Sequence, residues 1–244
     1  MQLDPTVITD SWQLFVTGAF ITLQLSLISF VLGLLLAVPV AALSMSTHAV
    51  LNGIAILYLA IIRGVPFIAI VFIVHYGTAT MGARTPAFWS GVIALTLFAS
   101  AYFSEVIRST VSALPPGQWD SGRVVGMSRL QTLRYIIIPQ SLGPMIPPGV
   151  NVTIMMIKES SVISAITVGE LTYQGLVVQG NTFAPFEVFI TVALIYWGIT
   201  LAFSRVAIWA ERRIGASQRS IRPVGGIAER YLTLSRPKRR AEKS

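Results

Sequence analysis

Long stretches without a charged residue are the feature that most limits what this chain can fold into. No Asp, Glu, Lys or Arg occurs in residues 11–62, 64–83, 85–104 or 135–157. A helix needs roughly 20 predominantly apolar residues to cross about 30 Å of hydrocarbon. Only 11% of the residues are charged, whereas soluble domains carry about 25%. The sequence therefore predicts an all-α integral membrane protein.

The apolar segments predict about five membrane-spanning helices. The first charge-free run is too long for one span, and its polar patch at residues 44–52 is where it should break. The predicted spans cover residues 16–43, 66–80, 87–106, 144–168 and 185–209.

Arg63 leaves two interpretations of the second span open. In one, Arg63 lies mid-membrane in a continuous helix that begins near Ile54. In the other, residues 53–62 lie on the membrane surface and the span begins at Pro66, because a proline without an N–H group suits a helix start. We favour the second, with Arg63 reaching the cytoplasmic interface and Gly64 and Pro66 in structural roles.

The distribution of basic residues predicts the orientation. Of the 18 basic residues, eleven lie in residues 205–243, and four more surround the polar segment 113–135. The N-terminal leader has Asp4 and Asp10 but no base, and it does not resemble a cleavable signal peptide. Because basic residues stay cytoplasmic, we expect the N-terminus outside and the C-terminus inside, as an odd number of spans requires.

Composition also excludes several classes of function. The chain has no cysteine, only two histidines and no carboxylate cluster, so no metal site and no catalytic set is expected. Residues 215–244 read as a basic, partly disordered cytoplasmic tail that contacts anionic lipid headgroups. No aromatic-interleaved or groove-reading element accompanies this charge, so nucleic acid is not expected as a partner.

Residues 113–135 form a polar island between apolar segments. Pro115 and Pro116 end the preceding helix, and a short helix is predicted to begin near Gly117. Gly126 is placed to end that helix, and Ser128 and Gln131 have capping-box spacing for a second helix toward Pro139. Such an exposed element is expected to contact a partner in water.

The island resembles the EAA loop of ABC importer permeases. In that family pattern Asp120 stands for the Glu, Ser121 and Gly122 for the two Ala, Gly126 for the Gly, and Ile138-Pro139 for the closing pair. Gly122 stands where the family pattern has alanine. This departure weakens the predicted helix, because glycine lowers helix stability by about 1 kcal/mol relative to alanine. The resemblance implies that Trp119, Asp120, Ser121, Gly122, Gly126, Ser128 and Pro139 form the loop that couples to an ATPase.

Other segments resemble the permeases for polar amino acids and opines. They are Gly18-Ala-Phe-Ile-Thr-Leu-Gln-Leu-Ser26, Arg63-Gly-Val-Pro66, Ala101-Tyr-Phe-Ser-Glu-Val-Ile-Arg108, Lys158-Glu-Ser-Ser-Val162 and Trp209-Ala-Glu-Arg-Arg213. The resemblance covers roughly residues 13–214 and implies a permease domain over residues 1–214.

The resemblance also implies partners and a location. These are a second permease subunit, identical or sister, a cytoplasmic ATPase dimer that binds ATP and Mg²⁺, and an extracytoplasmic solute-binding protein, at a bacterial inner membrane. This chain has no phosphate-binding loop, so no cofactor is expected in it.

Lys158 and Glu159 are the sharpest candidates for a solute pathway. A charge at a helix centre costs about 2.5–3.5 kcal/mol on insertion scales, so such residues usually face an interior or a watery path. A zwitterionic amino acid offers charges of both signs, and Ser160, Ser161 and Gln24 could add polar contacts. The alternative is a buried structural network at a dimer interface, and both interpretations stay open.

Glu105 and Arg108 lie at helical i,i+3 spacing, compatible with an ion pair that sets the depth of the third span or holds the coupling loop. The overall prediction is an importer permease for a polar amino acid or similar zwitterion working by alternating access. The alternatives are an ABC importer permease for another solute, such as an opine or compatible solute, and a channel-like protein without ATPase coupling.

Overall fold

The computed structural model describes the backbone of residues 6–218 and the side chains of residues 6–209. Every regular element in this part of the chain is helical, which confirms the predicted all-α class. The predicted basic tail at residues 215–244 lies almost entirely outside the described residues. In the described part of the chain, four helices are long and apolar enough to span a membrane, and there are five spans if the bent helix pair at residues 49–80 is counted as one, in line with the predicted number of about five.

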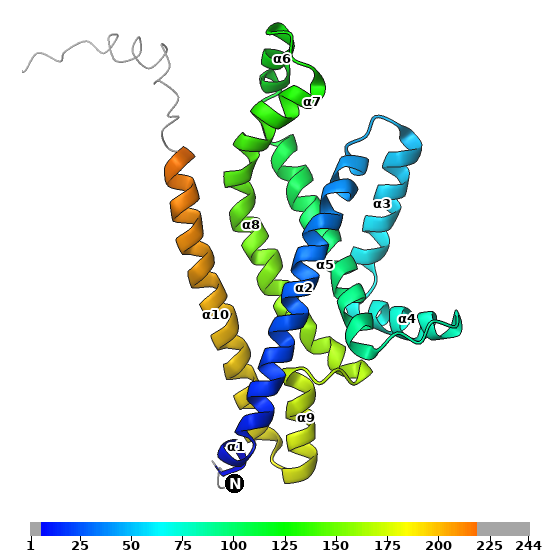
Figure 1. Cartoon of the computed structure of the whole chain (residues 1–244), viewed down its shortest axis with the longest axis vertical. Helices are drawn as coiled ribbons and strands as arrows, with labels where there is room; N and C mark the ends of the chain where they lie inside the picture. Colours follow the sequence, from blue (N-terminus) through cyan, green and yellow to red (C-terminus); the bar gives the residue numbers. More distant parts are fainter. Residues whose placement is uncertain (1–5, 219–244) are drawn as a thin grey trace, which may run out of the picture.

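The centre of the bundle is the pair α2 (Trp12–Ser44) and α5 (Ala87–Ser112), which pack along one another (Figure 1). Leu25 of α2 and Leu95 of α5 are completely buried in the main hydrophobic core, together with Met156. A hydrogen bond also connects the two helices, because the Ser29 hydroxyl donates to the Val92 carbonyl at 3.3 Å. Short α1 (Thr6–Asp10) precedes α2 at one end of the molecule.

The second span is broken, and its two halves differ from the prediction. α3 (Ala49–Gly64) runs beside α2 and contacts α5, whereas α4 (Phe67–Thr80) turns away from it by 108° (Figure 1). The interpretation of residues 53–62 as a surface-lying segment is therefore wrong. The break itself lies where it was expected: Val65 is extended, as a residue before proline must be, and a helix begins after Pro66.

The fourth span is longer than predicted. A continuous helical segment, Arg129–Ile166, joins α7 (Arg129–Thr132), the wide π-helical turn η1 (Leu133–Ile137), α8 (Ile138–Glu159) and the 3₁₀ turn η2 (Ser160–Ile166). The wide turn η1 ends two residues before Pro139. Proline lacks the N–H that an α-turn requires, so a local widening there is expected.

Helix α9 (Leu171–Thr182) was not predicted, because only residues 168–185 separate two apolar segments. It lies at the α1 end of the bundle, packed against α2 and α10 (Pro185–Gln218), with Phe15, Leu171 and Val188 forming a small second core. The start of α1 and the end of α10 lie at opposite ends of the molecule (Figure 1).

Candidate functional site

The polar island folds as a protruding helix–turn–helix. α6 (Gly117–Val124) and α7 lie at the end of the bundle opposite α1 and α9, beyond the ends of α2 and α5 (Figure 1). α6 begins at Gly117, as the two prolines predict, and Asp120 lies in its first turn. Gln140 at the start of α8 donates to the side-chain oxygen of Gln118 at 2.9 Å, which ties α6 to the span.

The turn between α6 and α7 has the predicted geometry. Gly126 has φ +77°, the left-handed conformation that glycine adopts without a Cβ clash. The capping box is complete, because Gln131 N–H donates to Ser128 Oγ at 3.3 Å and Ser128 N–H donates to Gln131 Oε1 at 2.8 Å. Both predictions are confirmed.

A close contact between Gly122 and Thr132 locks α6 against α7. A Cβ atom at Gly122 would overlap Thr132 Oγ1, closer than any real contact allows. Thr132 and Gly122 are both buried although most residues of the element are exposed, and the Thr132 hydroxyl donates to the Ser128 carbonyl. The glycine that lowers helix propensity is therefore the residue that permits the two helices to touch. No sequence signal pointed to Thr132.

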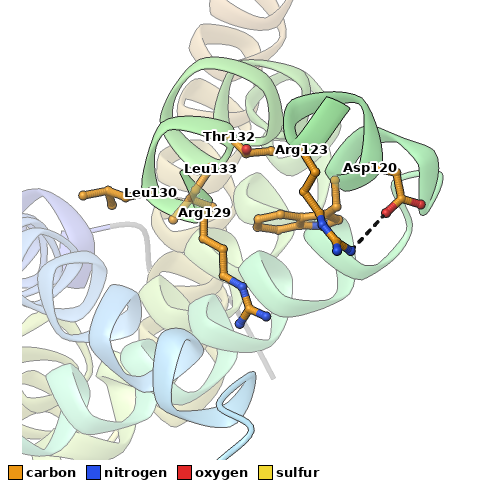
Figure 2. Close-up of a pocket in the computed structure, with 7 residues that line it drawn as sticks. Asp120, Arg123, Arg129, Leu130, Thr132 and Leu133 are labelled. Carbon is orange, nitrogen blue, oxygen red and sulfur yellow. Dashed lines mark ion pairs between the residues drawn. The ribbon is translucent and has the colours of Figure 1, made fainter. Parts of the chain in front are cut away.

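A cavity of about 540 Å³ opens between the two helices. It is lined by Trp119, Asp120, Arg123, Arg129, Leu130, Thr132 and Leu133 (Figure 2). Asp120 and Arg123 form an ion pair at 3.8 Å, with 69% and 80% of their side chains exposed. An ion pair this exposed contributes little to stability, so both side chains are available to a partner. Ser121 instead bonds to the Gly117 carbonyl within its own helix.

Large apolar side chains stand exposed on this polar tip. Val124, Val125 and Leu130 are 87%, 69% and 73% exposed. They lie on the protruding element rather than along the spans, so lipid does not account for them. Exposed apolar groups rimmed by charge are typical of a protein interaction surface.

Lys158 and Ser161 line a second cavity of about 490 Å³, between α8 and α10. Its other walls are Ile154, Ala193, Tyr196, Trp197 and Thr200. Lys158 is exposed, and no carboxylate of residues 6–209 lies within ion-pair distance of its ammonium group. The structure does not bring the remaining candidates to this cavity: Glu159 is half-buried, Ser160 is buried, and Gln24 is exposed on α2.

The sequence matches the family described as binding-protein-dependent transport system inner membrane component over residues 29–216. The chain belongs to this family of permeases. It is a multi-pass membrane subunit of an ABC importer.

Named relatives agree in length as well as in sequence. The permease is 35% identical to the probable amino-acid ABC transporter permease protein YckA of Bacillus subtilis over 190 residues, which cover 78% of this chain and 84% of the relative. It is 31% identical to the glutamine transport system permease protein GlnP of Escherichia coli over 216 residues, covering 88% and 99%. It is 32% identical to the nopaline transport system permease protein NocM of Agrobacterium fabrum over 237 residues, covering 93% and 97%.

Solved structures support the fold. A crystal structure of an amino acid ABC transporter with histidines matches with a TM-score of 0.81 at 35% identity, covering 87% of the permease and all of that chain. An inward-facing MetNI methionine ABC transporter matches with a TM-score of 0.70 at 17% identity, which bears on the fold alone.

Three charged residues of the permease meet where the second span breaks. Arg108 Nε donates to Glu105 Oε2 at 3.1 Å, which confirms the expected i,i+3 pair, and Arg63 Nη1 lies 3.7 Å from the same oxygen. The Arg63 guanidinium also stacks over Tyr102, 5.6 Å from the ring centre. Together with Gly64 these residues line a cavity of about 630 Å³. The partnership of Arg63 with Glu105 was not predicted, because 42 positions separate them.

Glu170 is a second carboxylate that the sequence analysis missed. It is completely buried and caps α9 by accepting hydrogen bonds from Thr172 N–H at 3.0 Å and Tyr173 N–H at 2.8 Å. The Tyr196 hydroxyl donates to it at 2.7 Å, and the Thr22 hydroxyl lies 3.5 Å away. Burial raises the pKa of Glu170, and the hydrogen bonds offset this only in part. One signal was available, because Glu170 is the single charged residue in residues 160–186.

Proposed function

We propose that this permease imports a polar amino acid or a related small zwitterion, driven by a separate ATPase that binds α6 and α7. The observation that carries the proposal is the protruding helix–turn–helix, with its close Gly122–Thr132 contact and its exposed apolar side chains Val124, Val125 and Leu130. The relatives named for an amino acid, glutamine and nopaline support the solute class. The same machine carrying another small solute is the alternative.

The geometry suggests how motion would reach the membrane. α6 is fixed to α7 through Gly122 and to α8 through the Gln118–Gln140 hydrogen bond. The helical segment Arg129–Ile166 continues from α7 to the cavity that contains Lys158. A partner that displaces α6 would therefore move the wall of that cavity as part of one body, which is the basis of alternating access here.

We further propose which proteins the permease binds and how it is oriented in the membrane. ATP and Mg²⁺ belong to the cytoplasmic ATPase dimer at α6 and α7, and this chain contributes no cofactor ligand. A solute-binding protein would dock at the α9 end, which lies outside a bacterial inner membrane together with the N-terminus. A second permease subunit, identical or related, completes the pathway, and anionic lipid accompanies the basic C-terminal tail.

On the pathway, Lys158 is assigned to the solute carboxylate. Among the described side chains no carboxylate pairs with it, and it lies in a cavity whose volume of about 490 Å³ suits an amino acid. Ser161 lies in the same cavity, and Glu159 faces a separate environment, as adjacent helix positions must. We assign a smaller contribution to solute binding to Glu159, Ser160 and Gln24, because they do not line this cavity.

Replacement of the turn glycine tests the coupling. Gly126→Val forces a side chain into the left-handed region, which costs about 1–3 kcal/mol locally, while no described residue beyond its two chain neighbours lies within 4 Å of the new Cβ. Gly82→Val is the matched control, since Gly82 has φ +82°, equally open surroundings and a place outside the coupling loop.

With the cognate ATPase and binding protein co-expressed, we expect Gly126→Val to lower solute uptake and ATPase co-purification while membrane insertion is retained. Gly82→Val should keep all three near the wild-type level. Uptake that persists in Gly126→Val, or in the absence of the ATPase, would refute the proposal and favour a channel.

A further inference from the structure

Glu170 gathers hydrogen-bond donors from three different helices. The α9 backbone supplies two, α10 supplies the Tyr196 hydroxyl, and α2 supplies the longer contact from Thr22. Thr22 also accepts a hydrogen bond from Leu171 N–H at 3.1 Å, so its hydroxyl joins α2 to the first residue of α9. The network therefore joins three elements that are far apart in sequence.

Capping α9 alone does not require a glutamate. Asp, Asn and Ser are the preferred N-cap residues because a short side chain reaches the free amides best. The side chain of Glu170 is longer, it has 0% exposure, and it forms no ion pair with a cation in the described part of the chain. A buried carboxylate is costly unless several donors satisfy it. The extra reach of glutamate is explained by the donors on α2 and α10.

Tyr196 links this network to the Lys158 cavity. Its hydroxyl donates to Glu170 and accepts from Thr172 Oγ1 at 3.3 Å, so the position of the ring is fixed from two sides. The same tyrosine lines the cavity that contains Lys158. Glu170 is therefore separated from that cavity by a single side chain.

The backbone conformation at both ends of α9 explains why the Glu170 hydrogen bonds matter for the position of this helix. Thr167 and Phe183, which precede and follow α9, both have positive φ angles of 63° and 54°. Non-glycine residues in this conformation persist only where the surroundings hold them. α9 is thus a short helix between two strained joints, and the Glu170 network is the polar attachment at its first turn.

We infer that Glu170 and Tyr196 are positioning residues that hold α10 against α2 and α9 and so fix the wall of the Lys158 cavity. The inference rests on the proposed function only in taking this cavity to be the solute pathway. It goes beyond that function by assigning control of the cavity to a buried carboxylate that never touches solute.

The absence of cysteine makes the inference directly measurable. Thr200 lines the cavity, so Thr200→Cys provides one thiol whose labelling by an uncharged maleimide reports access to that cavity. The rate is measured in the assembled transporter in lipid nanodiscs, alone and combined with Tyr196→Phe, Glu170→Asp or Thr22→Val. Tyr173→Phe is the matched control, because Tyr173 bonds to Glu170 through its backbone amide.

Glu170→Asp separates capping from positioning, since aspartate keeps the charge and is a preferred cap but is one methylene shorter. We expect Tyr196→Phe and Glu170→Asp each to change the labelling rate about tenfold, which corresponds to about 1.4 kcal/mol. Their combination should change it no further, because both break the same contact. Tyr173→Phe should label at the wild-type rate.

A wild-type rate in both Tyr196→Phe and Glu170→Asp would overturn the inference, and so would fully additive effects. Tyr196→Phe removes one oxygen atom, so it serves even if Glu170→Asp does not assemble. Labelling requires neither ATP hydrolysis nor transported solute. Failure of this test therefore leaves the ATPase-coupling proposal intact, and failure of the Gly126→Val test leaves the labelling result interpretable.

Discussion

Glu105 in α5 and Glu170 at the start of α9 are two carboxylates that are stabilised in different ways. Glu105 is 27% exposed and is shared by Arg63 and Arg108, each of which is more than 40% exposed. Glu170 is fully buried, and its partners are two backbone amides and two hydroxyl groups. The first is an ion-pair cluster open to water, whereas the second is a hydrogen-bonded charge without a counter-ion among the described residues.

The difference indicates separate mechanical roles for the two carboxylates. Exposed ion pairs exchange partners at little cost, so the Glu105 cluster tolerates small displacements. A buried carboxylate with directional donors tolerates little displacement, which suits a fixed joint. The permease thus combines an adaptable junction at the break of the second span with a rigid junction at α9.

Removal of the buried carboxylate should have the largest effect. Glu170→Ala leaves the Tyr196 hydroxyl and two α9 amides without their acceptor, and each unsatisfied buried group costs about 1–3 kcal/mol. We expect the free energy of unfolding in detergent to fall by about 3 kcal/mol. Glu187→Ala, in the first turn of α10, is the control and should cost below about 1 kcal/mol. Equal losses in Glu170→Ala and Glu187→Ala would mean that the buried Glu170 network stabilises the protein no more than a charge in a helix first turn does. That result would contradict the assignment of a rigid junction at α9.

Neutralising the exposed cluster should have a smaller, salt-dependent effect. Glu105→Gln leaves Arg63 and Arg108 facing each other, and we expect a loss of about 1 kcal/mol at low ionic strength. Raising the salt concentration should shrink this loss, because exposed charges are screened. Unfolding at roughly 0.05 and 0.5 M salt measures both values. A Glu105 effect that ignores salt, or a Glu170→Ala effect that follows it, would contradict the assignment.

The pH dependence should be the smallest effect. Burial raises the folded-state pKa of Glu170 above the ordinary value of 4.5, so between these two values the folded protein holds a proton that the unfolded chain has released. Wild-type stability should therefore rise as pH falls through the raised pKa and level off near the ordinary value. The one titratable partner is Tyr196, since Thr22 and the α9 amides do not titrate.

Glu170→Gln should lose this pH-dependent component. The measurement is the difference in unfolding free energy between wild type and Glu170→Gln from pH 8 to pH 4.5. A constant difference across that range would mean that Glu170 titrates with its ordinary pKa.

Local signals were sufficient to predict the coupling element. Pro116, Gly126, Ser128 and Gln131 act on backbone groups within a few positions, so their geometry follows from the chain itself. The break before Pro66 was predictable for the same reason. The directions of α3 and α4 were not, because both are short and apolar and only packing against α2 and α5 distinguishes them.

Contacts between distant positions could not be predicted. Arg63 meets Glu105, Gly122 meets Thr132, and Glu170 meets Tyr196 only because the helices pack in one particular register. The sequence marks Lys158 and Glu159 as unusual charges, and the same packing places Lys158 at the α8–α10 cavity and Glu159 elsewhere. Residue type reveals that a charge needs a partner, but the fold decides which one.

The unbroken run from Arg129 to Ile166 has a simple mechanical consequence. Its 38 residues would measure about 57 Å at 1.5 Å per residue, nearly twice the thickness of the hydrocarbon layer. If one end swung through only about 5°, the other would sweep about 5 Å, roughly one helical pitch. A small rotation at one end of this segment is in this way enlarged to molecular dimensions at its other end.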